Sequence, residues 1–95
     1  MSGDGDDVGA DLPADVEATL AQLLAEAAAA ARRREGEAVS AIVDTVETVV
    51  RNKVPAGLLC ERLEHGCASV ERLSVDEPLV AAEYLDAMER LVRSA

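Results

Sequence analysis

Apolar residues recur every three or four positions through most of the chain, which is the spacing of one face of an α-helix. Four such stripes follow one another, with polar residues on the intervening positions, and they predict helices near 13–34, 37–52, 55–73 and 77–93. In chain order the stripes consist of Val16, Leu20, Leu23, Leu24, Ala27, Ala28 and Ala31; Val39, Ile42, Val43, Val46, Val49 and Val50; Leu58, Leu59, Leu63, Cys67, Val70 and Leu73; and Leu79, Val80, Tyr84, Leu85, Met88, Leu91 and Val92.

The breaks between the stripes decide the architecture. Pro55 and Pro78 interrupt the pattern, because proline disfavours helical geometry in the residue before it. Between the first two stripes the break is Gly36, which gives two antiparallel hairpins and an all-α four-helix bundle. The alternative is one long first helix that pairs in a dimer, since Leu24 and Ile42 lie about five turns apart and stay in phase. We favour the break, because a long isolated helix would leave its apolar stripe exposed.

The start of the chain differs from the rest. Residues 1–11 are acidic and rich in glycine, so we expect a disordered tail ahead of one helical domain at 12–95. No segment reaches the roughly 18 continuous apolar residues of a membrane span, and the acidic opening is unlike a signal peptide. We therefore expect a cytoplasmic protein without a membrane partner, in which Cys60 and Cys67 are reduced thiols.

Charge and composition indicate the solvent in which the protein works. The chain has 19 acidic residues against 9 basic ones, a net charge of -10, a single lysine, no Phe or Trp and one Tyr. Carboxylates keep a surface hydrated in concentrated salt, where the long apolar stems of lysine are avoided. This balance predicts a salt-adapted protein.

Candidate catalytic and metal-binding residues are few. His65 and Cys67 project about 200° apart on a helix, so they cannot form a nucleophile–base pair by themselves. Cys60 and Cys67 share a face but lie about 10.5 Å apart along the axis, too far for one zinc ion, and there is no second histidine. We predict a protein that is not an enzyme, with no catalytic residue, no cofactor and no specific metal.

Gly66 indicates close packing. A glycine within an amphipathic helix costs about 1 kcal/mol relative to alanine, so a neighbour usually occupies the space that it leaves. We predict a small-residue packing site made by Gly66 and Cys67 of the third helix with Ala27 and Ala31 of the first.

A small group of cationic and polar positions offers candidate contacts to a partner. Three consecutive arginines end the first predicted helix, where they complement the helix dipole and can pair with nearby glutamates. The lone lysine follows an asparagine in the next connector. The candidate contacts are Arg32, Arg33, Arg34, Asn52 and Lys53.

Three stretches carry a resemblance to other proteins: Arg51-Asn52-Lys53-Val54-Pro55, Leu63 with Gly66-Cys67, and Ala82-Glu83-Tyr84-Leu85 with Ala87-Met88. In these stretches the chain resembles a group of short, acidic, uncharacterised haloarchaeal proteins that form a domain of unknown function. The resemblance implies an all-helical fold, without a known activity, cofactor or catalytic residue.

Taken together, these patterns predict a non-enzymatic helical interaction or structural module of a salt-adapted cytoplasm. We expect a protein partner or self-association as a homodimer, because the core is small and further burial of leucine and valine would stabilise it. The alternative is a nucleic-acid-associated regulatory protein that uses the arginines. It is disfavoured, because no aromatic residue is interleaved with them to stack on a base.

Overall fold

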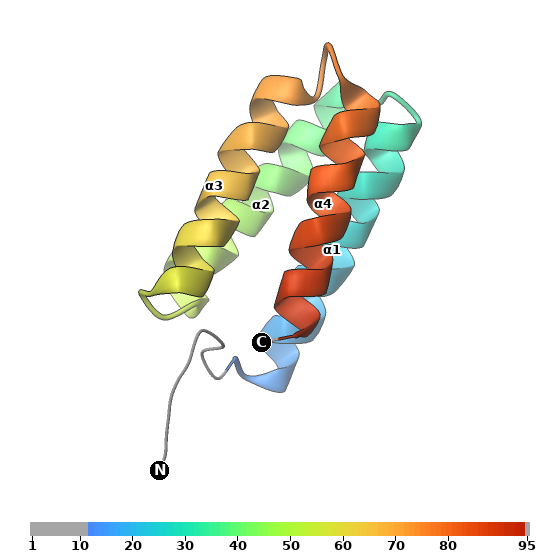
Figure 1. Cartoon of the computed structure of the whole chain (residues 1–95). Helices are drawn as coiled ribbons and strands as arrows, with labels where there is room; N and C mark the ends of the chain where they lie inside the picture. The colour runs from blue at the N-terminus through green and yellow to red at the C-terminus, as the bar shows by residue number, and fades with distance from the viewer. Residues whose placement is uncertain (1–11, 95) are drawn as a thin grey trace.

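The chain folds as four antiparallel helices in up-down-up-down order (Figure 1). The computed structural model describes residues 12–94, and the predicted tail at 1–11 lies outside the described residues. The helices are α1 (Ala14–Arg32), α2 (Gly36–Lys53), α3 (Leu58–Leu73) and α4 (Pro78–Arg93). The prediction of an all-α bundle of two hairpins is confirmed, and none of the described helices is long and apolar enough to cross a membrane.

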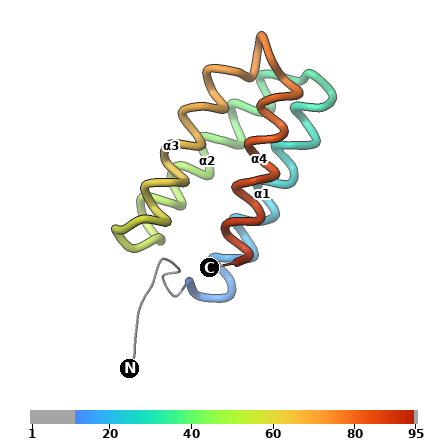
Figure 2. The backbone as a smooth tube through the Cα atoms, viewed as in Figure 1, coloured from blue at the N-terminus to red at the C-terminus, as the bar shows by residue number. Residues whose placement is uncertain are grey.

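Each helix packs against two neighbours, so that the four stand at the corners of a square. The neighbouring pairs are α1–α2, α2–α3, α3–α4 and α4–α1 (Figure 2). The contact is most extensive between α1 and α4, the first and last helices. Both carry buried alanines, Ala27, Ala28, Ala30 and Ala31 on α1 and Ala81 and Ala82 on α4, and such small side chains allow helices to approach closely.

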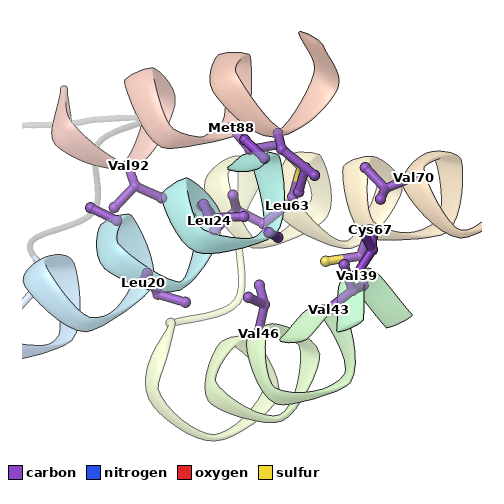
Figure 3. Close-up of a cluster of buried hydrophobic side chains, with 14 of the residues drawn as sticks. Leu20, Leu24, Val39, Val43, Val46, Leu63, Cys67, Val70, Met88 and Val92 are labelled. Carbon is purple, nitrogen blue, oxygen red and sulfur yellow. The ribbon is translucent and has the colours of Figure 1, made fainter. Parts of the chain in front are cut away.

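The core is filled by aliphatic side chains from all four helices (Figure 3). The largest fully buried residues are five leucines, six valines and Cys67. Burying a side chain of this size stabilises a fold by roughly 1.5–3 kcal/mol. Because no large aromatic ring contributes to the core, its stability depends on many small contacts.

The turn between α1 and α2 is made by Arg34 and not by Gly36. Arg34 adopts a left-handed conformation with φ 61°, whereas Gly36 is already the first residue of α2. The Glu35 amide donates to the Ala30 carbonyl at 3.0 Å and the Arg34 amide donates to the Ala31 carbonyl at 3.0 Å, which is the Schellman ending of a helix. The predicted break at Gly36 is therefore displaced by two residues, and the alternative of one long first helix is wrong.

The turn between α2 and α3 explains why α3 begins at Leu58 and not at the predicted residue 55. Val54 adopts an extended conformation before Pro55, and its side chain is buried. Gly57 then has φ 152°, a backbone conformation that residues with a side chain rarely adopt. The start of α4 is close to the predicted residue 77, since the helix begins at Pro78. A proline in the first turn of a helix costs no hydrogen bond, because the N–H that it lacks would have no partner there.

Gly57 in the second turn and Gly36 at the start of α2 are expected to respond in opposite ways to alanine. Gly57→Ala should lower the free energy of unfolding by about 1–2 kcal/mol through backbone strain, although nothing lies within 4 Å of the added Cβ. Gly36→Ala should raise it by about 0.4–1 kcal/mol, because that Cβ also meets open space and α2 already has helical geometry there. Urea unfolding of both variants measures this, and equal effects would contradict the assignment of the strained turn.

Candidate functional site: an apolar groove between α3 and α4

A hollow in the surface runs between α3 and α4. This α3–α4 groove has a volume of about 430 Å³ and opens to solvent. Its apolar lining comes from Leu58 and Gly66 on α3 and from Tyr84, Met88 and Leu91 on α4. Grooves of this size and polarity are typical of binding sites for small molecules or protein segments.

The depth of the groove depends on Gly66 and Met88. A Cβ at Gly66 would lie 2.6 Å from the Met88 Sδ and 3.0 Å from the Met88 Cε, well inside van der Waals contact. The glycine therefore lets the methionine lie flat against the backbone of α3, and Met88 forms the floor with only 5% of its surface exposed. Methionine adapts its shape to what it contacts, which suits a binding surface.

The walls are apolar residues that the sequence pattern assigned to the core. Leu58 is 44% exposed and Tyr84 41%, while Val80 and Leu79 are exposed apolar residues of α4 outside the groove lining. The fourth apolar stripe is too wide for one buried face, because at 100° per residue Leu79 and Tyr84 turn away from the side that buries Leu85 and Val92. The excess width of that stripe is the signal in the sequence that indicates a surface site.

Charged residues border the groove on the α3 side. Glu61, Arg62 and His65 contribute to its lining, and all three are exposed. The charges of Glu61 and Arg62 cancel formally, so this part of an acidic molecule carries little net charge. His65 thus lies at the rim of the groove.

The two cysteines lie away from the groove and are poor nucleophiles. Cys67 is buried in the core, and burial together with nearby glutamates raises the pKa of its thiol to about 12. The half-buried Cys60 has its Sγ 3.6 Å from a carboxylate oxygen of Glu64, and burial and that carboxylate raise its pKa as well. Neither thiol is poised as a thiolate at neutral pH.

Acidic residues gather on the adjacent side of α3, facing α2. Carboxylate oxygens of Asp44, Glu47 and Glu71 all lie within 4.8 Å of one another, and we call this group the α2–α3 acidic cluster. Partial burial and then repulsion from Glu71 and Asp44 raise the pKa of the Glu47 carboxyl. Three carboxylates of this kind are a donor set for a hard cation, but no other feature of the described structure points to a ligand there.

Comparison with known proteins places the chain in a family. A family model described as a domain of unknown function, DUF8101, matches residues 5–94. The chain belongs to this family. No curated protein and no solved structure matches it significantly. Membership of DUF8101 therefore gives no activity or ligand, and the functional argument has to come from the surfaces of the domain itself.

The cationic positions of this DUF8101 domain do not form one patch. Arg32 pairs with Asp86 of α4, and Arg33 pairs with Glu35 at 3.2 Å, as the spacing to that glutamate suggested. Asn52 and Lys53 are exposed at the other end of α2, which is about 27 Å long for its 18 residues. The five predicted partner contacts thus fall into two groups at opposite ends of the bundle.

The predicted small-residue site is also divided. Gly66 packs against Met88 of α4, whereas Ala27 and Ala31 belong to α1, which stands diagonally across the bundle from α3. The atoms nearest to an added Cβ at Gly66 belong to Met88, and not to an alanine of α1. The reason is that α4, and not α1, follows α3 around the square. Cys67, one residue further on, is buried in the core.

Coupling between Gly66 and Met88 can be measured with a double-mutant cycle. In a Met88→Ala background, Gly66→Ala should stabilise the domain by about 1 kcal/mol, since alanine is the better helix former. In the wild type most of that gain should be lost, because the Met88 side chain must move away from the added Cβ. The coupling energy between the two substitutions, measured by urea unfolding, should be about 1 kcal/mol. Gly36→Ala serves as the control and should show no coupling to Met88. Equal effects of Gly66→Ala in both backgrounds would contradict the contact.

The α2–α3 acidic cluster should destabilise the domain at neutral pH. A carboxyl whose pKa is raised by folding binds protons more readily in the folded state. Its charged form therefore lowers the free energy of unfolding, fully at a pH above the raised pKa and not at all below the unfolded pKa of about 4.5. Glu47→Gln should therefore raise the free energy of unfolding at pH 7, by up to about 0.5 kcal/mol.

The pH and salt dependence test this assignment. The gain from Glu47→Gln should shrink as the pH falls toward 4 and also in molar KCl, which screens the repulsion. Thermal unfolding at several pH values measures it, with Glu26→Gln on α1 as the matched control. A gain that does not depend on pH would show that the carboxylate charge is not its cause.

Proposed function

We propose that this DUF8101 domain is a non-enzymatic interaction module that binds a protein through the α3–α4 groove. The observation that carries the proposal is the row of solvent-facing apolar residues over that groove, above all Leu58 and Tyr84. A contiguous apolar patch on a small protein usually marks an interface, and tyrosine is enriched at interfaces because its ring packs while its hydroxyl stays hydrated. The methionine floor adds a surface that can adapt to a partner.

A non-enzymatic role is supported by the placement of the reactive side chains. His65 lies on the exposed side of α3, whereas Cys67 points into the core with a strongly raised pKa. The thiol and the imidazole therefore do not act on a common point. Binding through apolar contacts needs neither group.

We also propose that the domain works in concentrated salt. The excess of 19 acidic residues over 9 basic ones and the crowding of carboxylates in the α2–α3 acidic cluster support this, as does the resemblance to haloarchaeal proteins. At 1 M salt the Debye length is about 3 Å, so repulsion between such carboxylates is largely screened. Apolar contacts do not weaken in this way, which makes a groove of this kind a suitable binding surface there.

Binding of nucleic acid is less well supported. Two of the three arginines already pair with carboxylates, and the lysine lies at the opposite end of α2 from them. A phosphate backbone would meet two separate and partly neutralised sites. No observation in the described structure favours this alternative over the apolar groove.

Affinity capture from the cells of origin, at their own salt concentration, tests the proposed function. The wild-type domain should retain a protein partner, and Tyr84→Ser should reduce its recovery at least tenfold, because the exposed ring on the groove wall is removed. Leu79→Ser is the matched control, since Leu79 is at least as exposed but lies off the groove. Equal recovery with both variants would refute binding through the groove.

A further inference from the structure

Four apolar residues on the outer side of α4, the first three exposed and the last half-buried, form a line whose spacing is the same from either end. Val80, Tyr84, Ala87 and Leu91 follow one another at intervals of four, three and four residues, over about 16 Å of helix. We call them the α4 stripe. A twofold axis between Tyr84 and Ala87 lays the stripe antiparallel on a copy of itself, so that each tyrosine covers an alanine and each Val80 covers a Leu91.

The charges beside the stripe are complementary under the same rotation. Glu83 and Arg90 are exposed, lie seven residues apart on the same side of the stripe, and form no ion pair with the described part of the chain. In an antiparallel pair of helices, residues flanking the seam on one side face each other. Glu83 of each copy then faces Arg90 of the other, which gives two opposite-charge contacts for one interface.

Like-charge repulsion between two acidic copies is weak at this face. The charged residues at the groove and the stripe are Glu61, Arg62, Glu83 and Arg90, and their formal charges cancel. The α2–α3 acidic cluster, by contrast, lies on the adjacent side of the bundle. Two chains that each carry a net charge of -10 are therefore repelled less through the α3–α4 face than through that cluster.

We propose that the occupant of the α3–α4 groove is a second copy of this chain, docked antiparallel along the α4 stripe about a twofold axis. This inference rests on the proposed function, because it names the partner of the same groove. A standard interface takes about 800 Å² from each partner, which is roughly a sixth of the 5193 Å² surface of the chain. An interface limited to this face is small, so the dimer should dissociate in the micromolar range or above.

Sedimentation equilibrium of the full chain from 10 µM to 1 mM tests the inference. The wild type should approach twice the monomer mass as its concentration rises. Tyr84→Ser should raise the dissociation constant at least tenfold, whereas Leu79→Ser, which removes a leucine beside the stripe but not in it, should change it less than twofold. Circular dichroism of each variant checks that the helices are retained.

A charge swap tests the geometry itself. Glu83→Arg should weaken the dimer several-fold, because each new arginine faces Arg90 of the other copy. The double variant Glu83→Arg/Arg90→Glu should restore the wild-type constant within about twofold, because the pairs form again with reversed charge. Dimerisation that is indifferent to Glu83→Arg, or that the double variant does not restore, would overturn the antiparallel arrangement.

Two further outcomes overturn the dimer and separate it from the proposed function. If the wild type stays monomeric up to 1 mM but a captured host protein is lost with Tyr84→Ser, the groove is a docking site for another protein. If the chain dimerises equally well with Tyr84→Ser, the dimer forms on a different face. If the wild type neither self-associates nor captures a partner that depends on Tyr84, the proposed function is refuted as well.

Discussion

The close packing of α1 against α4 is the contact on which the rest of the structure depends. It joins the first and last helices and closes the square of the bundle, and the buried alanines on both helices make it possible. Each alanine buries little apolar area, so the stability of this contact comes from its extent. With α4 held against α1, only one side of α4 remains for the groove that it forms with α3.

Charge and apolar surface are separated around α3. Its side toward α2 carries Glu71, which repels Glu47, while its side toward α4 borders the groove with Arg62 and Leu58. Concentrated salt screens the repulsion between carboxylates on the first side of α3. The apolar contacts on the other side do not depend on charge. This separation leaves an acidic protein with a face at which like-charge repulsion is weak.

Helical periodicity was sufficient to predict the class of fold, the number of helices and most of the core, because residues such as Val39, Val43 and Val46 recur every three or four positions and share the buried face of one helix. The turns were harder to predict. At Arg34 two capping hydrogen bonds offset the cost of a left-handed backbone conformation. An arginine at this position does not by itself indicate such a turn. The groove was missed because an apolar residue such as Tyr84 contributes to a stripe in the same way whether it is buried or exposed. The neighbour of Gly66 depends on the order of helices around the square, which no single helix encodes.

The pairing of the first and last helices also has a consequence for biosynthesis. A nascent chain can form the α1–α2 hairpin early, since those helices are close in sequence. The largest helix–helix contact forms only after α4 has left the ribosome, because it joins the two ends of the helical region. Until then the alanine face of α1 has no permanent cover, so the acidic surface must keep the unfinished chain soluble during translation.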